Sequence, residues 1–85
     1  MQRTYCVEIY KIEDKLVAYM PKFDICEKGY HSIDEVVHFA RKKCLMTCTY
    51  SNDVPESDTY DAWEHLSGKY REENLIGLFM MDVEI

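Results

Sequence analysis

Apolar residues recur at helical spacing between residues 33 and 48. The stripe consists of Ile33, Val36, Val37, Ala40, Cys44 and Cys48. Spacings of three or four residues with one adjacent pair place these side chains on one face of an α-helix. Ser32 and Glu35 stand at the N-cap and N3 positions of a capping box, in which Ser32 accepts from a free backbone N–H and Glu35 reaches back to the N–H of Ser32. The sequence therefore predicts an amphipathic helix that begins just after Ser32.

The segments before and after this helix have the composition of β-strands. Residues 4–12 and 16–21 are rich in β-branched and aromatic residues, and residues 13–15 between them predict a turn. A hairpin is therefore expected. A short third strand is predicted at about residues 25–29, and the last strand is predicted at residues 75–85.

A second, shorter helix is predicted from about residue 59 to residue 67, after a loop at 49–57. Asp58 would cap this helix and Gly68 would end it. The inward-facing side chains would be Tyr60, Trp63 and Leu66. Aromatic side chains can also stack on nucleic-acid bases, but helical spacing in an acidic protein favours core packing.

The predicted order β-β-β-α-α-β describes one small α+β domain over residues 1–85, with the helices on one face of the sheet. In the last strand, the side chains that would face away from the helices are Ile76, Leu78 and Met80, followed by Asp82 and Glu84. A contiguous apolar patch in water is uncommon on a soluble monomer. We therefore expect these apolar residues to mediate self-association as a homodimer, the commonest symmetric assembly. The competing interpretation is that the N-terminal residues or the 49–57 loop fold over the patch.

The chain is acidic, with 16 Asp and Glu against 10 Lys and Arg and a formal net charge of −6. This balance disfavours direct DNA binding, because nucleic-acid affinity rests largely on Lys and Arg. It favours a basic partner protein, or simply solubility.

The longest nearly apolar run, Leu75–Met81, is too short to cross a bilayer, and no signal peptide is apparent. A cytoplasmic location with reduced cysteines is expected, with no membrane partner.

No cofactor or metal site is expected. Cys44 and Cys48 lie one helical turn apart, and the residues that could complete a zinc site with them are His31, His38, His65 and Cys26. However, both cysteines continue the apolar stripe of the predicted helix and no C-x-x-C motif is present, which favours core packing. The basic run Arg41–Lys43 is interpreted as a solvated helix face.

No catalytic residues are predicted, and the chain is not expected to be an enzyme. A metal-dependent nuclease would need several carboxylates converging on Mg²⁺. The candidates are Glu8, Asp34, Glu35, Asp82 and Glu84. In a chain with 16 acidic residues these are more simply helix-cap and sheet-rim charges.

The segment from Pro21 to Val36 resembles the N-terminal domain of the HicB antitoxin family, in which a stretch of the type P-D-L-P-G-C-x-x-x-G-x-T-x-x-E-A occurs. The matching positions are Pro21, Phe23, Cys26, Ser32 and Glu35. Ala40 falls where the family helix repeats a small residue, while "VPES" at 54–57 and the closing "MMDVEI" look like later family segments. The departures are Lys22, Asp24, Ile25 and Tyr30, with Gly29 one position earlier than the family glycine.

This resemblance implies a partial RNase H-like fold, in which the last strand lies parallel beside the first. It also implies a non-catalytic module that binds and occludes a small basic ribonuclease toxin of the HicA type. The residues expected to touch that partner are Lys22, Phe23, Asp24 and Glu27. Family members usually add a C-terminal DNA-binding module, and we expect no such module after the closing strand of this chain. Two alternatives stay open: a solitary homo-oligomeric HicB-like domain without a toxin, and a metal-dependent nuclease.

Overall fold

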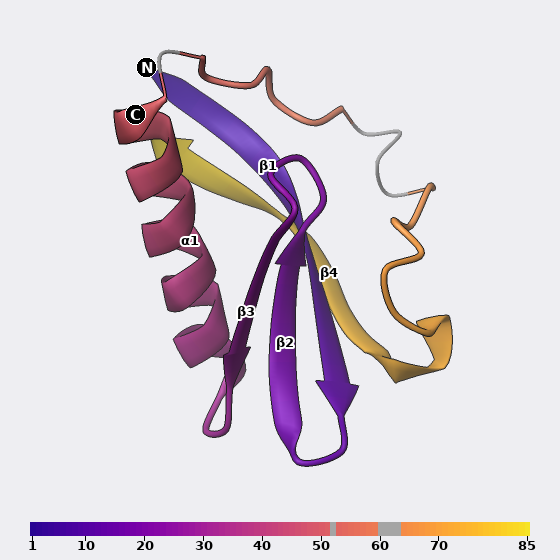
Figure 1. Cartoon of the computed structure of the whole chain (residues 1–85). Coiled ribbons are helices and arrows are strands. Elements are labelled where there is room, and N and C mark those ends of the chain that lie inside the picture. The colour runs from indigo at the N-terminus through magenta and orange to yellow at the C-terminus, as the bar shows by residue number, and fades with distance from the viewer. Residues whose placement is uncertain (52, 60–63) are drawn as a thin grey trace.

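The computed structural model describes residues 1–51, 53–59 and 64–85. Four strands form one antiparallel sheet in the order β3-β2-β1-β4, and one helix, α1, lies against one face of it (Figure 1). The elements are β1 (Gln2–Ile12), β2 (Lys15–Met20), β3 (Ile25–Gly29), α1 (Ile33–Tyr50), the 3-10 turn η2 (Glu72–Asn74) and β4 (Leu75–Glu84). The α+β class, the hairpin and the main helix are thus confirmed. No helix of the described residues is long and apolar enough to span a membrane.

The expected parallel pairing of the last strand with the first is wrong, because β4 runs antiparallel to β1. The path of the connection explains this. The helix α1 ends at the same end of the sheet where β1 begins, and residues 64–74 run toward the opposite end of the sheet, where β4 starts (Figure 1). β4 therefore starts at the end of the sheet where β1 finishes, and the two strands run in opposite directions.

The predicted second helix is not formed by the described part of residues 59–67. Thr59 and the segment 64–67 have no helical structure, and residues 60–63, which include Tyr60 and Trp63, lie outside the described residues. The expected cap, Asp58, has a different partner. Its carboxylate Oδ2 accepts from the backbone N–H of Cys6 at 2.7 Å, and its own N–H donates to the carbonyl of Thr4 at 2.8 Å. Asp58 therefore binds the backbone of β1 at Thr4 and Cys6.

The main core lies between α1 and the sheet. The buried helix residues are Val36, Ala40, Cys44 and Cys48. They pack on the strand residues Tyr5, Val7, Ile9, Ala18, Met20, Ile25, Met81 and Val83. The predicted stripe is confirmed at these four positions, whereas Val37 is half-buried and Ile33 is 42% exposed at the start of the helix.

The predicted capping box is confirmed on one side. Ser32 Oγ accepts from the backbone N–H of Glu35 at 3.1 Å. Glu35 Oε1 reaches back two residues further than expected and accepts from the N–H of Tyr30 at 3.1 Å. The box thereby ties the loop after β3 to the first turn of α1.

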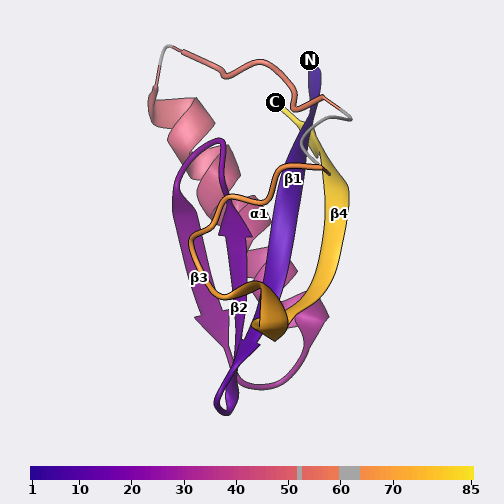
Figure 2. The same ribbon diagram turned by 90° about the vertical axis from the view of Figure 1, so that its right-hand side faces the viewer.

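The opposite face of the sheet carries a smaller, tyrosine-rich core. Tyr10, Val17 and Tyr19 are buried there, and Tyr70 packs against both tyrosine rings, with centroids 5.1 and 6.3 Å away. Figure 2 shows the chain that follows residue 64 crossing the strands on this face, opposite α1. Tyr70 of this segment covers Tyr10 and Tyr19, whereas Ser57 of the 49–57 loop lies with Met80 around a hollow on the β4 side.

Candidate functional site

The four residues expected to touch a partner belong to the β2–β3 connection and to β3. Phe23 is half-buried and packs edge-on against Tyr5, with ring centroids 4.8 Å apart and an interplanar angle of 82°. Such a pair stabilises a core beyond the area that it buries. Phe23 therefore anchors the turn to the main core.

Lys22 and Asp24 hold the same turn to other segments. Lys22 Nζ lies 3.6 Å from Asp58 Oδ1, and Asp24 Oδ1 accepts from the Tyr19 hydroxyl at 2.6 Å. This hydrogen bond, together with burial, raises the pKa of Tyr19 to about 12. Asp24 also lies 3.8 Å from Lys69 Nζ, and its backbone has a φ of 54°. Aspartate tolerates this left-handed conformation better than most residues do, so Asp24 suits the turn.

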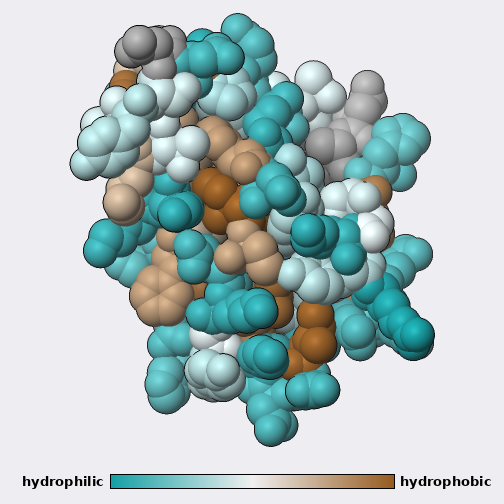
Figure 3. All heavy atoms as spheres, in the orientation of Figure 1, coloured by the Kyte–Doolittle hydropathy of each residue, from teal (hydrophilic) through white to brown (hydrophobic). Residues whose placement is uncertain are grey.

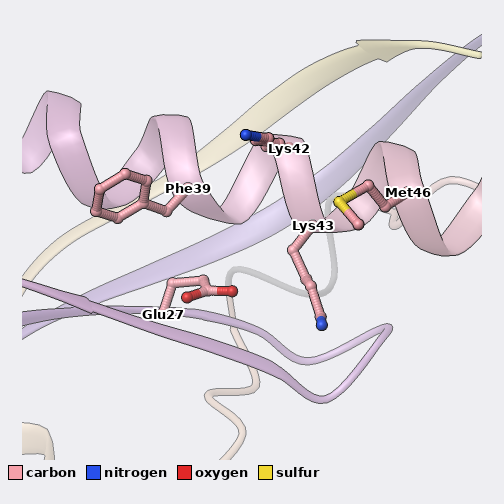
Figure 4. A pocket seen from close by; sticks show the side chains of 5 residues that line it. All are labelled: Glu27, Phe39, Lys42, Lys43 and Met46. Carbon is pink, nitrogen blue, oxygen red and sulfur yellow. The ribbon is translucent and has the colours of Figure 1, made fainter.

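Glu27 lies in a groove between β3 and α1, which we name the α1–β3 groove. Its lining residues are Glu27, Phe39, Lys42, Lys43 and Met46, around a cavity of about 150 Å³. Figure 4 shows Glu27 and Lys43 pointing into the space between helix and strand, with Phe39 and Met46 along the helix on either side of Lys43. Phe39 is 40% and Met46 46% exposed. The sequence interpretation missed this surface. The sequence feature that indicates this surface is a pair of large apolar residues, Phe39 and Met46, which lie off the buried stripe of α1 and flank the basic run Arg41–Lys43.

The three residues expected to mediate self-association lie on β4, at the edge of the sheet. Leu78 pairs with Glu8 and Met80 with Cys6, so both face away from α1, as predicted, and both are half-buried. Ile76 is the extra residue of a bulge, because Gly77 pairs with Ile9 and Leu75 with Tyr10. This position leaves Ile76 49% exposed.

The carboxylates considered for a metal site do not converge. Asp34 and Glu35 begin α1 at one end of the molecule, whereas Asp82 and Glu84 end β4 at the other (Figure 1). In the described part of the chain, no group of three or more His, Cys, Asp or Glu side chains could hold a metal ion.

The remaining candidate carboxylate, Glu8, is buried and has partners of its own. It is 1% exposed. Its oxygens accept from the Tyr10 hydroxyl at 2.5 Å, the Ser67 hydroxyl at 2.7 Å and the Ser67 backbone N–H at 3.0 Å. Glu8 therefore fastens the segment around Ser67 to the second face of the sheet.

The buried thiols predict a selective labelling pattern. Burial, with a smaller contribution from Cys48, raises the pKa of Cys44 to about 12, and burial with the nearby Glu8 carboxylate raises the pKa of Cys6 to about 11. Alkylation requires the thiolate, of which Cys44 would hold about one part in ten thousand at pH 8. We expect iodoacetamide to label half-buried Cys26 first and to reach Cys6 and Cys44 only after denaturant is added.

Peptide mapping by mass spectrometry measures this order. Rapid labelling of Cys44 in the native protein would contradict it. Native mass spectrometry of protein purified without chelator also tests the expectation of free thiols, since a stoichiometric zinc adduct would show a metal site at these cysteines.

No family model matches this chain, and searches of curated proteins and of solved structures likewise returned no match. The resemblance to HicB domains therefore rests chiefly on the motif from Pro21 to Val36. Within that motif, Ser32 and Glu35 cap α1, Phe23 packs in the core, and the Cys26 sulfur lies 2.8 Å from the Tyr70 hydroxyl. The motif residues thus have clear structural roles in this fold.

Proposed function

We propose that this chain is a non-catalytic binding module of the HicB antitoxin type, which binds and occludes a small basic ribonuclease of the HicA type. The observation that carries this proposal is the chemistry along β4. An apolar stretch of this edge strand passes into an acidic one, and we name its members, Ile76, Leu78, Met80, Asp82 and Glu84, the β4 strip.

The apolar half of the β4 strip supplies affinity. A Leu or Met side chain that becomes fully buried contributes roughly 1.5–3 kcal/mol. The position of β4 at the sheet edge adds a second means of recognition, because an edge strand can hydrogen-bond a strand of another protein through its backbone. A strand of a partner protein therefore fits along this edge.

The acidic half of the β4 strip selects the charge of the partner. Asp82 and Glu84 are exposed, although Asp82 Oδ1 also accepts from the Thr4 hydroxyl at 2.7 Å and Glu84 lies 3.2 Å from the N-terminal amine. Together with the net charge of −6, these carboxylates favour approach of a basic protein.

The positions of the acidic residues support binding over catalysis. A Mg²⁺-dependent nuclease needs carboxylates that converge on the ion. Here the candidates lie at opposite ends of the molecule, and Glu8 is occupied by Tyr10 and Ser67. The nuclease alternative has no geometric support among these residues.

A second candidate function uses the same strip for a homodimer without a toxin. Ile76 is 49% exposed beside half-buried Leu78 and Met80, and a second copy would cover all three. A two-fold interface places the same patch of each subunit against the other. Binding of a toxin and dimerisation would then compete for one surface.

The test is inhibition of a HicA-type ribonuclease acting on a fluorescent RNA. An equimolar amount of the chain should abolish cleavage, and association should slow as salt screens the charges. The double variant Asp82→Lys/Glu84→Lys should weaken inhibition at least about tenfold, equivalent to 1.4 kcal/mol. The control Glu72→Lys/Glu73→Lys makes the same charge change at exposed residues of η2 and should inhibit normally.

Two results would contradict the proposal. One is undiminished ribonuclease activity in the presence of folded chain, and the other is RNA cleavage by the chain alone that EDTA abolishes.

Sedimentation of the wild type and of Leu78→Lys tests the alternative of a homodimer without a toxin. A dimeric wild type with a folded, monomeric variant would support it, whereas a wild type that is monomeric at micromolar concentration would count against it.

A further inference from the structure

We propose that the α1–β3 groove is a second binding surface, and that its ligand is an extended, acidic segment of a partner protein. The groove lies at the β3 edge of the sheet, opposite the β4 strip. Its chemistry is also opposite, because lysines accompany its apolar residues. The inference concerns a different surface from the one proposed for the ribonuclease and does not depend on it.

Apolar side chains continue along the groove beyond what the core requires. Phe39, Lys43, Met46 and Tyr50 follow one another at spacings of three or four residues, so they lie along one side of α1. Tyr50 is 84% exposed. A second hollow, of about 360 Å³, adjoins the first and is lined by Lys43, Met46, Thr47, Tyr50 and Ser51. In the space-filling view of Figure 3, apolar side chains gather between hydrophilic ones on the face where α1 lies beside the strands.

The strand beside the groove is open to pairing. β3 is at the edge of the sheet, and its strand partner among the described residues is β2. An edge strand presents backbone N–H and C=O groups to an extended peptide, while the neighbouring helix contacts every second side chain of that peptide. The five residues of β3 suit a ligand segment of similar length.

The charge of the groove determines the sign of its ligand. Arg41, Lys42 and Lys43 are consecutive and exposed, no ion pair involves them within the described residues, and α1 has no acidic residue after Glu35. This local excess of positive charge stands out in a chain of net charge −6. It attracts carboxylates and repels a basic ribonuclease.

Glu27 and the small number of cations in the groove indicate the sequence pattern and the chemical class of the ligand. Because the Glu27 carboxylate and Lys43 point into the same space, the ligand side chain beside Glu27 should be apolar, and an acidic residue should lie toward Lys42, which points away from Glu27 (Figure 4). A segment in which acidic and apolar residues alternate meets this requirement. Nucleic acid fits less well, because its affinity grows with the number of phosphates that Lys and Arg neutralise, and among the described residues that line the groove only Lys42 and Lys43 are cations.

The experiment titrates ¹⁵N-labelled chain with an eight-residue peptide in which Glu and Val alternate, and follows amide chemical shifts. We expect shifts at residues 25–29 and 39–50, and fluorescence anisotropy of labelled peptide should give a dissociation constant. The variant Lys42→Glu/Lys43→Glu should weaken binding at least about tenfold, a loss of 1.4 kcal/mol. The control Lys11→Glu/Arg71→Glu has the same net charge change at exposed residues elsewhere and should bind within about twofold of the wild type.

Several results would overturn the proposal. They are shifts absent from the groove, equal binding of a peptide in which Lys replaces Glu, or unchanged affinity of the Lys42→Glu/Lys43→Glu variant. Tighter binding of a single-stranded oligonucleotide to the same residues would assign the groove to nucleic acid instead. Concentration-dependent groove shifts in the absence of peptide would assign it to a second copy of the chain.

Discussion

Replacement of Glu8 by alanine should lower the free energy of unfolding by about 2–4 kcal/mol, because the buried Tyr10 hydroxyl that loses its acceptor costs about 1–3 kcal/mol and the part-buried bonds from exposed Ser67 add about 1 kcal/mol. Three donors from Tyr10 and Ser67 now share the Glu8 carboxylate. The substitution also leaves a cavity on a face whose core is small. Chemical denaturation measures the loss, and for a domain of this size 1 kcal/mol corresponds to a melting-temperature shift of roughly 4–8 °C.

The loss should be concentrated in the segment that Glu8 fastens. In the Glu8→Ala variant, hydrogen exchange of the Ser67 amide should become fast, whereas amides of α1 should keep their relative protection. Glu8→Gln should show an intermediate loss, because an amide has one acceptor oxygen in place of two. The exposed Glu72→Ala serves as control and should change stability by less than about 0.5 kcal/mol. A Glu8→Ala variant as stable as this control would show that the network adds little.

Substitution of Gly29 by alanine should destabilise the protein by about 1–3 kcal/mol, the usual range for overpacking a core. A Cβ at Gly29 would lie 2.2 Å from Glu35 Oε1 and 2.7 Å from Val36 Cγ1. Glu35 can swing away, but only by giving up the hydrogen bond from Tyr30. Val36 is fully buried in the first turn of α1 and has no room to move. The glycine is therefore required for close approach of β3 to the helix.

The chain provides a matched control in Gly77. A Cβ at this position in β4 would meet Ile9 Cβ at 3.4 Å, which is ordinary contact. Gly77→Ala should therefore stay within about 1 kcal/mol of the wild type, since alanine also restricts the unfolded chain. Equal stability of the two alanine variants would show that β3 and α1 adjust to the added methyl group.

Local sequence patterns predicted the four strands and the main helix, but they also predicted a second helix that the described part of residues 59–67 does not form. The apolar spacing from Val36 to Cys48 predicted the buried side of α1, and Ser32 predicted its first residue. The strands were predicted from their β-branched and aromatic residues. Such local predictions succeed because the direction of each side chain depends on backbone geometry within a few residues. The exposed residues of the α1–β3 groove are present in the same pattern, but they became a surface only when β3 was placed beside the helix.

The tertiary structure decided what local patterns leave open. Asp58 has the features of a helix cap, yet its carboxylate accepts from Cys6, 52 residues earlier, and Glu8 finds its partner in Ser67, 59 residues later. The direction of β4 likewise depends on the path that the chain takes after α1. A hydrogen-bonding side chain has similar affinity for a nearby N–H and for a distant one. The partner that it binds depends on whether packing brings the distant group within reach. That packing depends on the whole chain and not on the residues next to the side chain.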